Sequence, residues 1–119
     1  MPRAPAADRP AAAFRACSDP TRLRILALLR GGEMCVGDLV TVLGVPQPSA
    51  SRHLAYLRRA GLVAVRRDGL WCHYSLAPAR TAFARKLRGC LGALRDLPDV
   101  RADADRAARL RREGGCCPP

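Results

Sequence analysis

The sequence predicts a mainly α-helical domain with one small β-hairpin, and two neighbouring stretches carry this prediction. Residues 36–60 form two short amphipathic patterns joined by the turn Gly44-Val45-Pro46. Residues 62–76 form two strand-like runs separated by Asp68-Gly69, a strong signal for a two-residue hairpin turn. Two helices joined by a tight turn and followed by a basic hairpin are the order of elements in a winged helix-turn-helix.

The second of these helices begins at Gln47, ends just before Gly61, and has one apolar and one polar face. Ala50, Leu54 and Leu57 recur at spacings of four and three residues, which places them on one side. Pro48 suits the first helical turn, where a missing N–H costs nothing. The polar side and the exposed start supply the candidate contacts to DNA, which are Gln47, Ser49, Ser51, Arg52, His53 and Tyr56.

The predicted hairpin spans Leu62–Arg67 and Leu70–Leu76. With a turn at Asp68-Gly69, Val65 pairs with Cys72 and Val63 pairs with Tyr74 on one face. The alternative is a solvated charged loop in an unrelated α+β domain. The tip adds two candidate contacts to DNA backbone or minor groove, Arg66 and Arg67.

Helices are also predicted on both sides of this motif. Pro10–Cys17 is short and alanine-rich, and Val36–Leu43 is the first helix of the pair. Asp19-Pro20 is a capping residue followed by a first-turn proline, so it opens a helix over Thr21–Arg30. That helix is apolar nearly all round, so we expect it at the centre of the core. Asp99–Arg112 is predicted as a weaker helix.

A further helix, Ala79–Leu94, carries an apolar stripe that predicts a homodimer. A chain of 119 residues makes one small domain, which often needs a partner subunit to complete its core. We expect the stripe to pack against its copy in a second chain. The alternative is that it folds back on its own core. The stripe consists of Phe83, Leu87, Cys90, Leu91 and Leu94.

These elements suggest three parts. Residues 1–9 are expected to be a disordered lead. Residues 10–97 are expected to form the winged helix-turn-helix DNA-binding and dimerisation domain. Residues 98–119 are expected to form a C-terminal helix and a cysteine-containing tail.

The charge of the chain is concentrated on the predicted winged helix. The chain has a net charge of +11, and residues 20–88 hold 12 basic against 3 acidic side chains, a net +9. Each flank carries only +1. Such an excess could serve solubility alone. Its position around the second helix of the pair favours phosphate contacts, and therefore double-stranded DNA as the partner.

The chain has no pattern of a secreted or membrane protein. The N-terminus lacks the apolar core of a signal peptide, and no apolar run is long enough to span a bilayer. We therefore expect a cytoplasmic protein with no membrane partner, whose six cysteines are thiols in a reducing compartment.

The cysteines fall into two groups. Cys17, Cys72 and Cys90 occupy apolar positions and are expected to pack as small hydrophobic residues. Cys35 stands at the start of a helix, where exposed N–H groups stabilise a thiolate, so it is either packing or a ligand. Cys116-Cys117 follow two glycines and form a chelating pair for a soft, thiophilic ion. The alternative is a dispensable tail.

Four motifs together resemble the ArsR/SmtB family of metal-sensing repressors, and most closely its arsenic- and antimony-responsive branch. The resemblance covers roughly residues 12–90. It implies a homodimer that represses a metalloid-resistance operon, has no permanently bound cofactor, and leaves its operator when As(III) or Sb(III) binds. The motifs are Asp19-Pro-Thr-Arg-Leu-Arg-Ile, Glu33-Met-Cys-Val-Gly-Asp-Leu39, Gln47-Pro-Ser-Ala-Ser-Arg-His-Leu54 and Asp68-Gly-Leu-Trp-Cys-His-Tyr74.

The chain departs from the family's arsenite motif, E-L-C-x-C-D-L-C. It keeps the first cysteine as Cys35, but the other two positions are Gly37 and Val40. A three-sulfur site cannot form within that helix. We expect Cys35 to recruit Cys116 and Cys117, from its own chain or the partner's, unless the sensor uses another set.

The sequence is also compatible with other functions. A repressor of the same kind could sense thiol oxidation or persulfides through Cys35 and Cys90, or through the tail pair. A thiol-based metalloid carrier or small thiol enzyme is disfavoured, because the chain has no C-x-x-C, no base beside a nucleophile and no phosphate loop. A plain architectural DNA-binding protein would require that every cysteine is packing.

Overall fold

The computed structural model describes residues 9–115 and contains the helices and hairpin in the predicted order. A 3-10 helix, Ala93–Asp96, joins the last two helices. The other elements, in chain order, are α1 (Pro10–Cys17), α2 (Pro20–Arg30), β1 (Met34–Cys35), α3 (Val36–Leu43), α4 (Gln47–Arg59), β2 (Val63–Asp68), β3 (Trp71–Leu76), α5 (Ala82–Gly92) and α6 (Pro98–Arg112).

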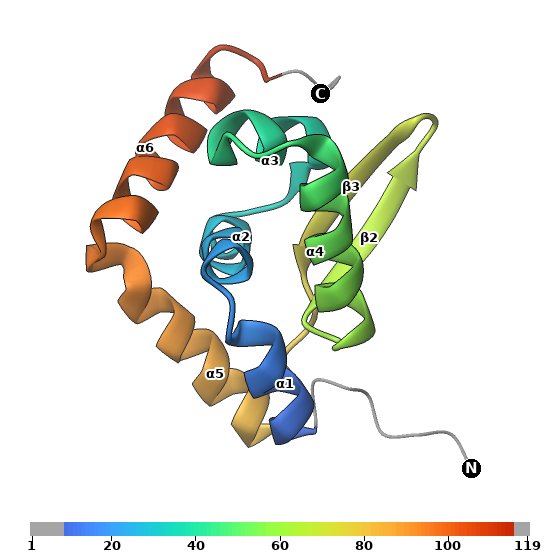
Figure 1. The fold of residues 1–119 in the computed structure, drawn as a ribbon, viewed down its shortest axis with the longest axis vertical. Coiled ribbons are helices and arrows are strands. Elements are labelled where there is room, and N and C mark those ends of the chain that lie inside the picture. Colours follow the sequence, from blue (N-terminus) through green and yellow to red (C-terminus); the bar gives the residue numbers. More distant parts are fainter. Residues whose placement is uncertain (1–8, 116–119) are drawn as a thin grey trace.

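Helix α2 is the central core helix, as predicted. Asp19 caps its start by accepting a hydrogen bond from the backbone N–H of Arg22 at 3.0 Å, and Pro20 occupies the first turn. Ile25 and Leu26 are fully buried. Figure 1 shows α2 in the middle of the molecule, with α5 and α6 on one side and α3, α4 and the hairpin on the other.

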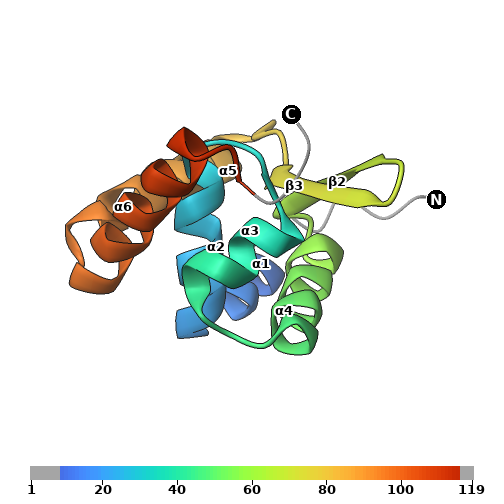
Figure 2. The same ribbon diagram turned by 90° about the horizontal axis from the view of Figure 1, so that it is seen from above.

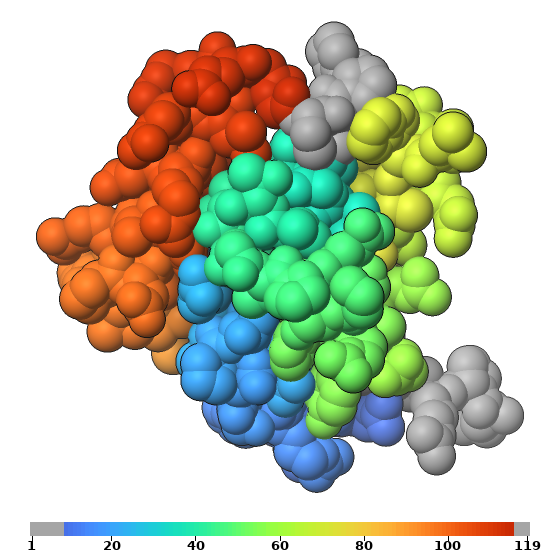
Figure 3. All heavy atoms as spheres, turned by 45° about the horizontal axis from the view of Figure 1, so that its top comes forward, coloured from blue at the N-terminus to red at the C-terminus, as the bar shows by residue number. Residues whose placement is uncertain are grey.

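The helix-turn-helix is formed as predicted by α3 and α4. Helix α3 ends at Gly44, whose φ of 68° is the left-handed conformation that a residue with a side chain rarely adopts. Ala50, Leu54 and Leu57 are buried, so the predicted apolar face of α4 packs on the core. In Figure 3 the hairpin projects at one edge of the molecule beside these two helices.

The hairpin is present, but its predicted register was wrong by two residues. Val65 pairs with Tyr74 and Val63 pairs with Leu76, while Arg67 lies opposite Cys72. The two-residue turn is Gly69-Leu70 and not Asp68-Gly69, because Gly69 takes the positive φ of 61° at the first central position. A shift of two residues keeps every side chain on its predicted face.

The sheet also has a third strand that was not predicted. The short strand β1 pairs with β3, so the strand order is β1-β3-β2 and all neighbours are antiparallel. Met34 lies opposite Tyr74, and Cys35 lies opposite His73. The wing is therefore joined by backbone pairing to the strand that carries Cys35.

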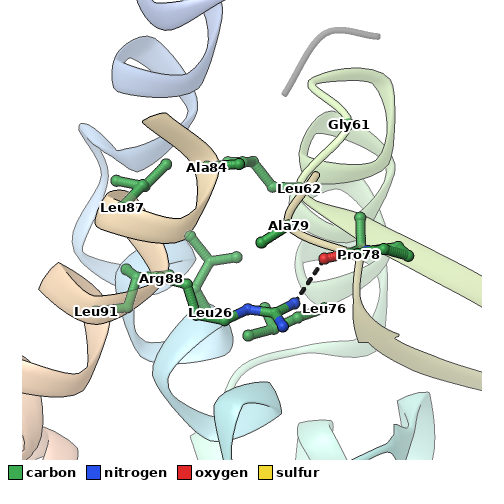
Figure 4. A pocket seen from close by; sticks show the side chains of 11 residues that line it. Leu26, Gly61, Leu62, Leu76, Pro78, Ala79, Ala84, Leu87, Arg88 and Leu91 are labelled. Carbon is green, nitrogen blue, oxygen red and sulfur yellow. Dashed lines mark hydrogen bonds between the residues drawn. The ribbon is translucent and has the colours of Figure 1, made fainter. Parts of the chain in front are cut away.

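Helix α5 is shorter than predicted because the hydroxyl of Thr81 caps it, accepting from the backbone N–H of Ala84 at 3.1 Å. The expectation that its stripe finds no partner within its own chain was wrong in part. Leu91 is buried and Leu94 packs half-buried against the chain's own core. Figure 4 shows Leu87 and Leu91 lining a pocket together with Leu26. Cys90, by contrast, is exposed.

Helix α6 packs against α2 and α3 through Val100, Asp103 and Ala107, which are buried. Figure 2 shows α5 and α6 on the opposite side of α2 from α4 and the wing. The C-terminal end of α6 lies near the start of α3, where Gly115 approaches Asp38. Within residues 9–115 no helix is both long and apolar enough to cross a bilayer.

Candidate nucleic-acid interface and thiol site

Helix α4 presents most of the predicted DNA contacts to solvent. Gln47, Ser51 and Arg52 are exposed, and Ser49 is half-buried. The first turn has no side-chain cap, because Pro46 precedes it. Backbone N–H groups at such an open helix start suit a phosphate oxygen. The start of α4 therefore combines hydroxyl, amide and guanidinium donors on one accessible surface.

His53 and Tyr56, also predicted as DNA contacts, are drawn toward the body of the protein by Arg22. The Arg22 guanidinium carbon lies 4.2 Å from the centre of the Tyr56 ring, a cation–π contact. Its Nη1 lies 3.4 Å from Nδ1 of His53. Arg22 also donates from Nε to the carbonyl of Ala16 at 2.7 Å. These contacts fix the middle of α4 against α1 and α2.

Asp19 completes this cluster. Its Oδ2 lies 3.9 Å from Nδ1 of His53. Burial acts to raise the pKa of Asp19, but hydrogen bonding from the Arg22 backbone and the charges of His53 and Arg22 outweigh it, so the pKa is lowered. The carboxylate is therefore kept ionised as a helix cap beside the reading helix.

The two wing arginines, Arg66 and Arg67, are both exposed but stand in different surroundings. Arg66 forms a two-pronged contact with Glu33, with Nη2 2.7 Å from Oε1 and Nε 3.2 Å from Oε2. The hydrogen bond from Arg66 lowers the pKa of Glu33. Arg67 lies opposite Cys72 at the end of the hairpin. Since side chains alternate along a strand, the two arginines lie on opposite faces of the sheet.

A cross-strand row connects the wing to Cys35. Cys35 of β1 lies opposite His73 of β3, and His73 lies opposite Arg66 of β2. Directly opposed residues of antiparallel strands share one face, with Cβ atoms about 5 Å apart. Arg66 was predicted as a DNA contact, but the structure places it on the face that carries the candidate thiol ligand.

A cavity of about 280 Å³ lies over this face, between β1, the start of α3, the wing and the end of α6. Its walls carry both signs of charge together with an imidazole and the sulfur of Cys35, which is disulfide-bonded in this structure and not the thiol that was predicted. Gly114 and Gly115 close one side. Its polar lining residues are Glu33, Cys35, Asp38, Arg66, His73 and Arg111.

Cys35 is 2% exposed and caps α3, its sulfur accepting from the backbone N–H of Asp38 at 3.4 Å. A Cβ placed on Gly115 would lie 2.9 Å from Oδ2 of Asp38, so the chain passes directly against this carboxylate. The other two predicted ligands, Cys116 and Cys117, lie outside the described residues. In residues 9–115 no three His, Cys, Asp or Glu side chains form a group that could hold a metal ion.

Cys17, Cys72 and Cys90 differ in their surroundings. Cys17 and Cys72 are half-buried thiols, whereas Cys90, on the stripe predicted to pack against a second copy, is exposed in the single chain. Burial raises the pKa of Cys17, and the neighbouring Cys90 raises it further. The two thiols, on α1 and α5, therefore interact electrostatically.

Sequence reasoning missed Arg22 and Glu33 as organising residues, and also a buried carboxylate. Asp103 is 1% exposed and accepts from Arg24 at 2.8 Å and from Arg106 at 2.6 Å. No local signal reveals these partners, because Arg24 and Asp103 are 79 positions apart. The apolar cavity in Figure 4 measures only about 30 Å³, enough for one water molecule, and offers no ligand site.

Comparison with protein families gives a match over the helix-turn-helix. The family described as "Bacterial regulatory protein, arsR family" matches residues 19–65. This range includes α2, α3 and α4 and ends in β2.

Similar curated proteins include two repressors. The arsenical resistance operon repressor of Escherichia coli K12 is 49% identical over 75 residues, which cover 62% of this chain and 64% of that protein, just under two thirds of its length. A probable mercury resistance operon repressor of Streptomyces lividans is 38% identical over 107 residues, covering 90% of this chain and 82% of that protein.

Solved structures agree with the fold. HlyU from Vibrio cholerae N16961 superposes with a TM-score of 0.65 at 30% identity, covering 76% of this chain and 92% of that one. The cadmium sensor CMTR from Mycobacterium tuberculosis gives a TM-score of 0.57 at 37% identity, covering 73% and 84% of the two chains. The chain therefore belongs to the arsR family of bacterial regulatory proteins, which are DNA-binding transcriptional regulators and not enzymes.

Proposed function

We propose that this protein is a repressor that binds operator DNA as a homodimer and leaves it when trivalent arsenic or antimony binds Cys35, Cys116 and Cys117. Support comes first from its relatives. Two further similar proteins, from Pseudomonas putida, are arsenic resistance transcriptional regulators at 46% and 40% identity. The observation that carries the proposal is the cavity shared by Cys35 and Gly114-Gly115, the residues directly before the tail cysteines.

The DNA contacts follow from the exposure of α4. Two copies of α4 in a symmetric dimer enter successive major grooves of a palindromic site. Gln47, Ser51 and Arg52 make the base and phosphate contacts, and Arg67 reaches the flanking backbone. The net charge of +9 over residues 20–88 supplies the attraction that is independent of sequence.

The dimer forms through α1 and α5. Phe14 is 58% exposed and stacks edge-to-face on Phe83, with ring centres 5.5 Å apart and planes at 72°. The exposed ring of Phe14, together with half-buried Phe83 and Leu87, forms an apolar patch that a second copy would cover. The apolar stripe of α5 thus serves both its own core, through Leu91, and the partner.

The thiol site suits a soft ion with three sulfur ligands. Cys35 sits at a helix start, where the dipole favours a thiolate. Gly114 and Gly115 adopt positive φ values of 92° and 66° beside this helix. In the sequence only Gly115 separates Gly114 from the first tail cysteine, Cys116. We therefore propose that all three sulfurs come from one chain.

Binding exchanges oxygen for sulfur on the metalloid. Arsenous acid brings three hydroxyl groups, and each is replaced by one cysteine sulfur. Three As–O bonds break and three As–S bonds form, while the three thiol protons leave with the hydroxyls as three water molecules. Arsenic stays trivalent, so the exchange itself needs no oxidant or reductant. Cys35 is disulfide-bonded in this structure, so a dithiol reductant must first convert that disulfide to two thiols and is itself oxidised to a disulfide.

A fluorescence-anisotropy titration on the DNA upstream of the coding sequence tests the proposal. The protein is kept reduced and titrated with and without arsenite, antimonite, Hg(II), zinc and a persulfide donor. We expect tight binding that collapses with the trivalent metalloids. Tight, sequence-specific binding that ignores both metalloids would contradict the proposed inducer.

A thiol redox or persulfide sensor is the second candidate, and the electrostatic interaction between the Cys17 and Cys90 thiols favours it. Both thiols lie on the helices that we assign to the dimer. Oxidation of this pair would alter the contact between α1 and α5. Release of DNA by the persulfide donor, with no response to metalloids, would select this candidate over the first.

A further inference from the structure

We propose that the Glu33–Arg66 ion pair transmits the state of the inducer site to the wing, with Glu33 acting as the positioning residue. This inference rests on the proposed function, because it takes Cys35 as an inducer ligand. It assigns to Glu33 a regulatory role in which the carboxylate touches neither DNA nor the ion.

The first observation is the continuity of the sheet. Strand β1 is two residues long and pairs with β3, which in turn pairs with β2. Cys35, His73 and Arg66 form one row across the three strands. A displacement of β1 is therefore carried to the wing through backbone pairing and through one face of side chains.

The second observation is the ion pair itself. Glu33 lies directly before strand β1, and its side chain lines the same cavity as Cys35. Its carboxylate spans the middle strand to reach Arg66 on β2 through two parallel hydrogen bonds. A two-pronged contact fixes direction as well as distance. The carboxylate therefore sets where the Arg66 side chain points.

The third observation is that little else holds this part of the wing. Asp68, Gly69 and Leu70 are exposed, and Leu70 is fully exposed. Among residues 9–115, the Glu33 contact is the one ion pair that joins the hairpin to the rest of the protein. Elements with few buried contacts move at low energetic cost.

These observations define the coupling. Glu33, Cys35 and Arg66 line the same cavity, so an ion bound at Cys35 rearranges the wall from which Glu33 reaches the wing. The wing then changes its position relative to α4, and the two no longer fit DNA together. An inducer can shift this equilibrium only through a contact that differs between the two states, and the Glu33–Arg66 pair supplies that contact.

The test uses the full-length variant Glu33→Gln, which keeps the shape of the side chain and removes its charge. The matched control is Glu113→Gln, the same change at the only other glutamate of the chain. Each protein is measured for DNA affinity with and without saturating arsenite and for arsenite binding by calorimetry. The release ratio, defined as the DNA Kd with arsenite divided by that without, measures the coupling between the two sites.

Trp71 supplies an independent readout, because it is the only tryptophan of the chain and lies in the wing, 38% exposed. We expect arsenite to change the fluorescence of Trp71 in the wild type and in the control Glu113→Gln. In Glu33→Gln the change should be far smaller. If Glu33 contributed only to stability, arsenite would change the fluorescence of Trp71 equally in all three proteins.

We expect Glu33→Gln to bind arsenite as the wild type does, with a release ratio at least about fivefold smaller. Arg66→Gln and the double variant should give the same reduced ratio, because all three lack the same contact. If Glu33→Gln does not fold, the ratio of Arg66→Gln decides alone.

A wild-type release ratio in either single variant overturns the inference and leaves the proposed function intact. Loss of arsenite binding in Glu33→Gln also overturns it, because Glu33 would then belong to the ion site. Failure of arsenite to release the wild type contradicts the proposed function instead, which separates the two failures.

Discussion

Two arginine–carboxylate contacts of this protein have similar geometry and opposite surroundings. Arg24 holds Asp103 through two hydrogen bonds of 2.8 Å, and Arg66 holds Glu33 at 2.7 and 3.2 Å. The side chain of Asp103 is 1% exposed, whereas that of Glu33 is 37% exposed. The first contact fastens α6 to α2, and the second connects the wing to β1.

The difference in burial makes the Arg24–Asp103 contact costly to break and the Arg66–Glu33 contact easy to break and re-form. Breaking a buried pair leaves a charge without water or partner, and this is strongly destabilising. Breaking an exposed pair returns both groups to water at little cost. A contact that must open and close during regulation therefore belongs on the surface, and the wing has one there.

The largest effect is expected where the buried contact is broken. Asp103→Asn should lower the free energy of unfolding by about 3 kcal/mol, the low end for a buried pair because Arg24 and Arg106 are partly exposed. Urea denaturation followed by circular dichroism measures this. Asp105→Asn, at an exposed site on the same helix, is the control and should have almost no effect. Equal stability of the two variants would show that α6 is not fastened through Asp103.

A second prediction contrasts the reading surface with the α6 side of the molecule. Arg52→Ala should weaken DNA binding about tenfold, because a guanidinium that contacts a base or phosphate is lost. Arg109→Ala removes the same charge from exposed α6 and should change affinity very little. Anisotropy titrations at fixed salt compare the two. Similar losses in both would mean that net charge, and not α4, sets the affinity.

A third carboxylate, Asp19, is expected to have an intermediate effect on the free energy of unfolding. Asp19→Ala removes the cap of α2 and should cost about 1 kcal/mol of stability near neutral pH. Because the folded pKa of Asp19 is lowered, its ionised form stabilises the protein above the ordinary value of 3.8, and this contribution is lost as pH falls through the folded pKa. Unfolding measured from pH 7 to pH 3 should show the gap between variant and wild type narrowing. A gap that widens toward low pH would be inconsistent with an ionised cap.

The smallest effect is expected at the exposed contact. Glu33→Gln should change the free energy of unfolding by less than about 0.5 kcal/mol, since water replaces the lost partner. Thermal unfolding in low and high salt checks this, and any effect should shrink with salt. A loss of stability as large as that of Asp103→Asn would show that the Glu33–Arg66 pair is structural, as the Arg24–Asp103 pair is.

The parts of the fold that sequence predicted are those with local signals. Asp19-Pro20 marks the start of α2, Gly44 ends α3, and the alternating strands with a glycine turn mark the hairpin. In each case a side chain next to the boundary stabilises or permits the local conformation. The register was wrong because Gly69 can occupy either position of a two-residue turn, and only pairing with β1 and the core selects one.

The parts that sequence did not reveal depend on contacts between distant residues. Strand β1 is too short to carry a strand pattern, and it exists because β3 offers an edge for pairing. The burial of Asp103 depends on Arg24, and the orientation of His53 depends on Arg22. Of the candidate thiol site, Cys35 and its cavity are placed by the structure, while the roles of Cys116 and Cys117 stay predictions.

The most direct test of the account compares the double variants Cys116→Ser/Cys117→Ser and Cys17→Ser/Cys90→Ser with the wild type. Arsenite is titrated into each protein bound to operator DNA, and release is followed by anisotropy. We predict that all three proteins bind DNA equally, that the tail variant is not released, and that the Cys17→Ser/Cys90→Ser variant is released as the wild type is. Release of the tail variant at the wild-type arsenite concentration would contradict this prediction.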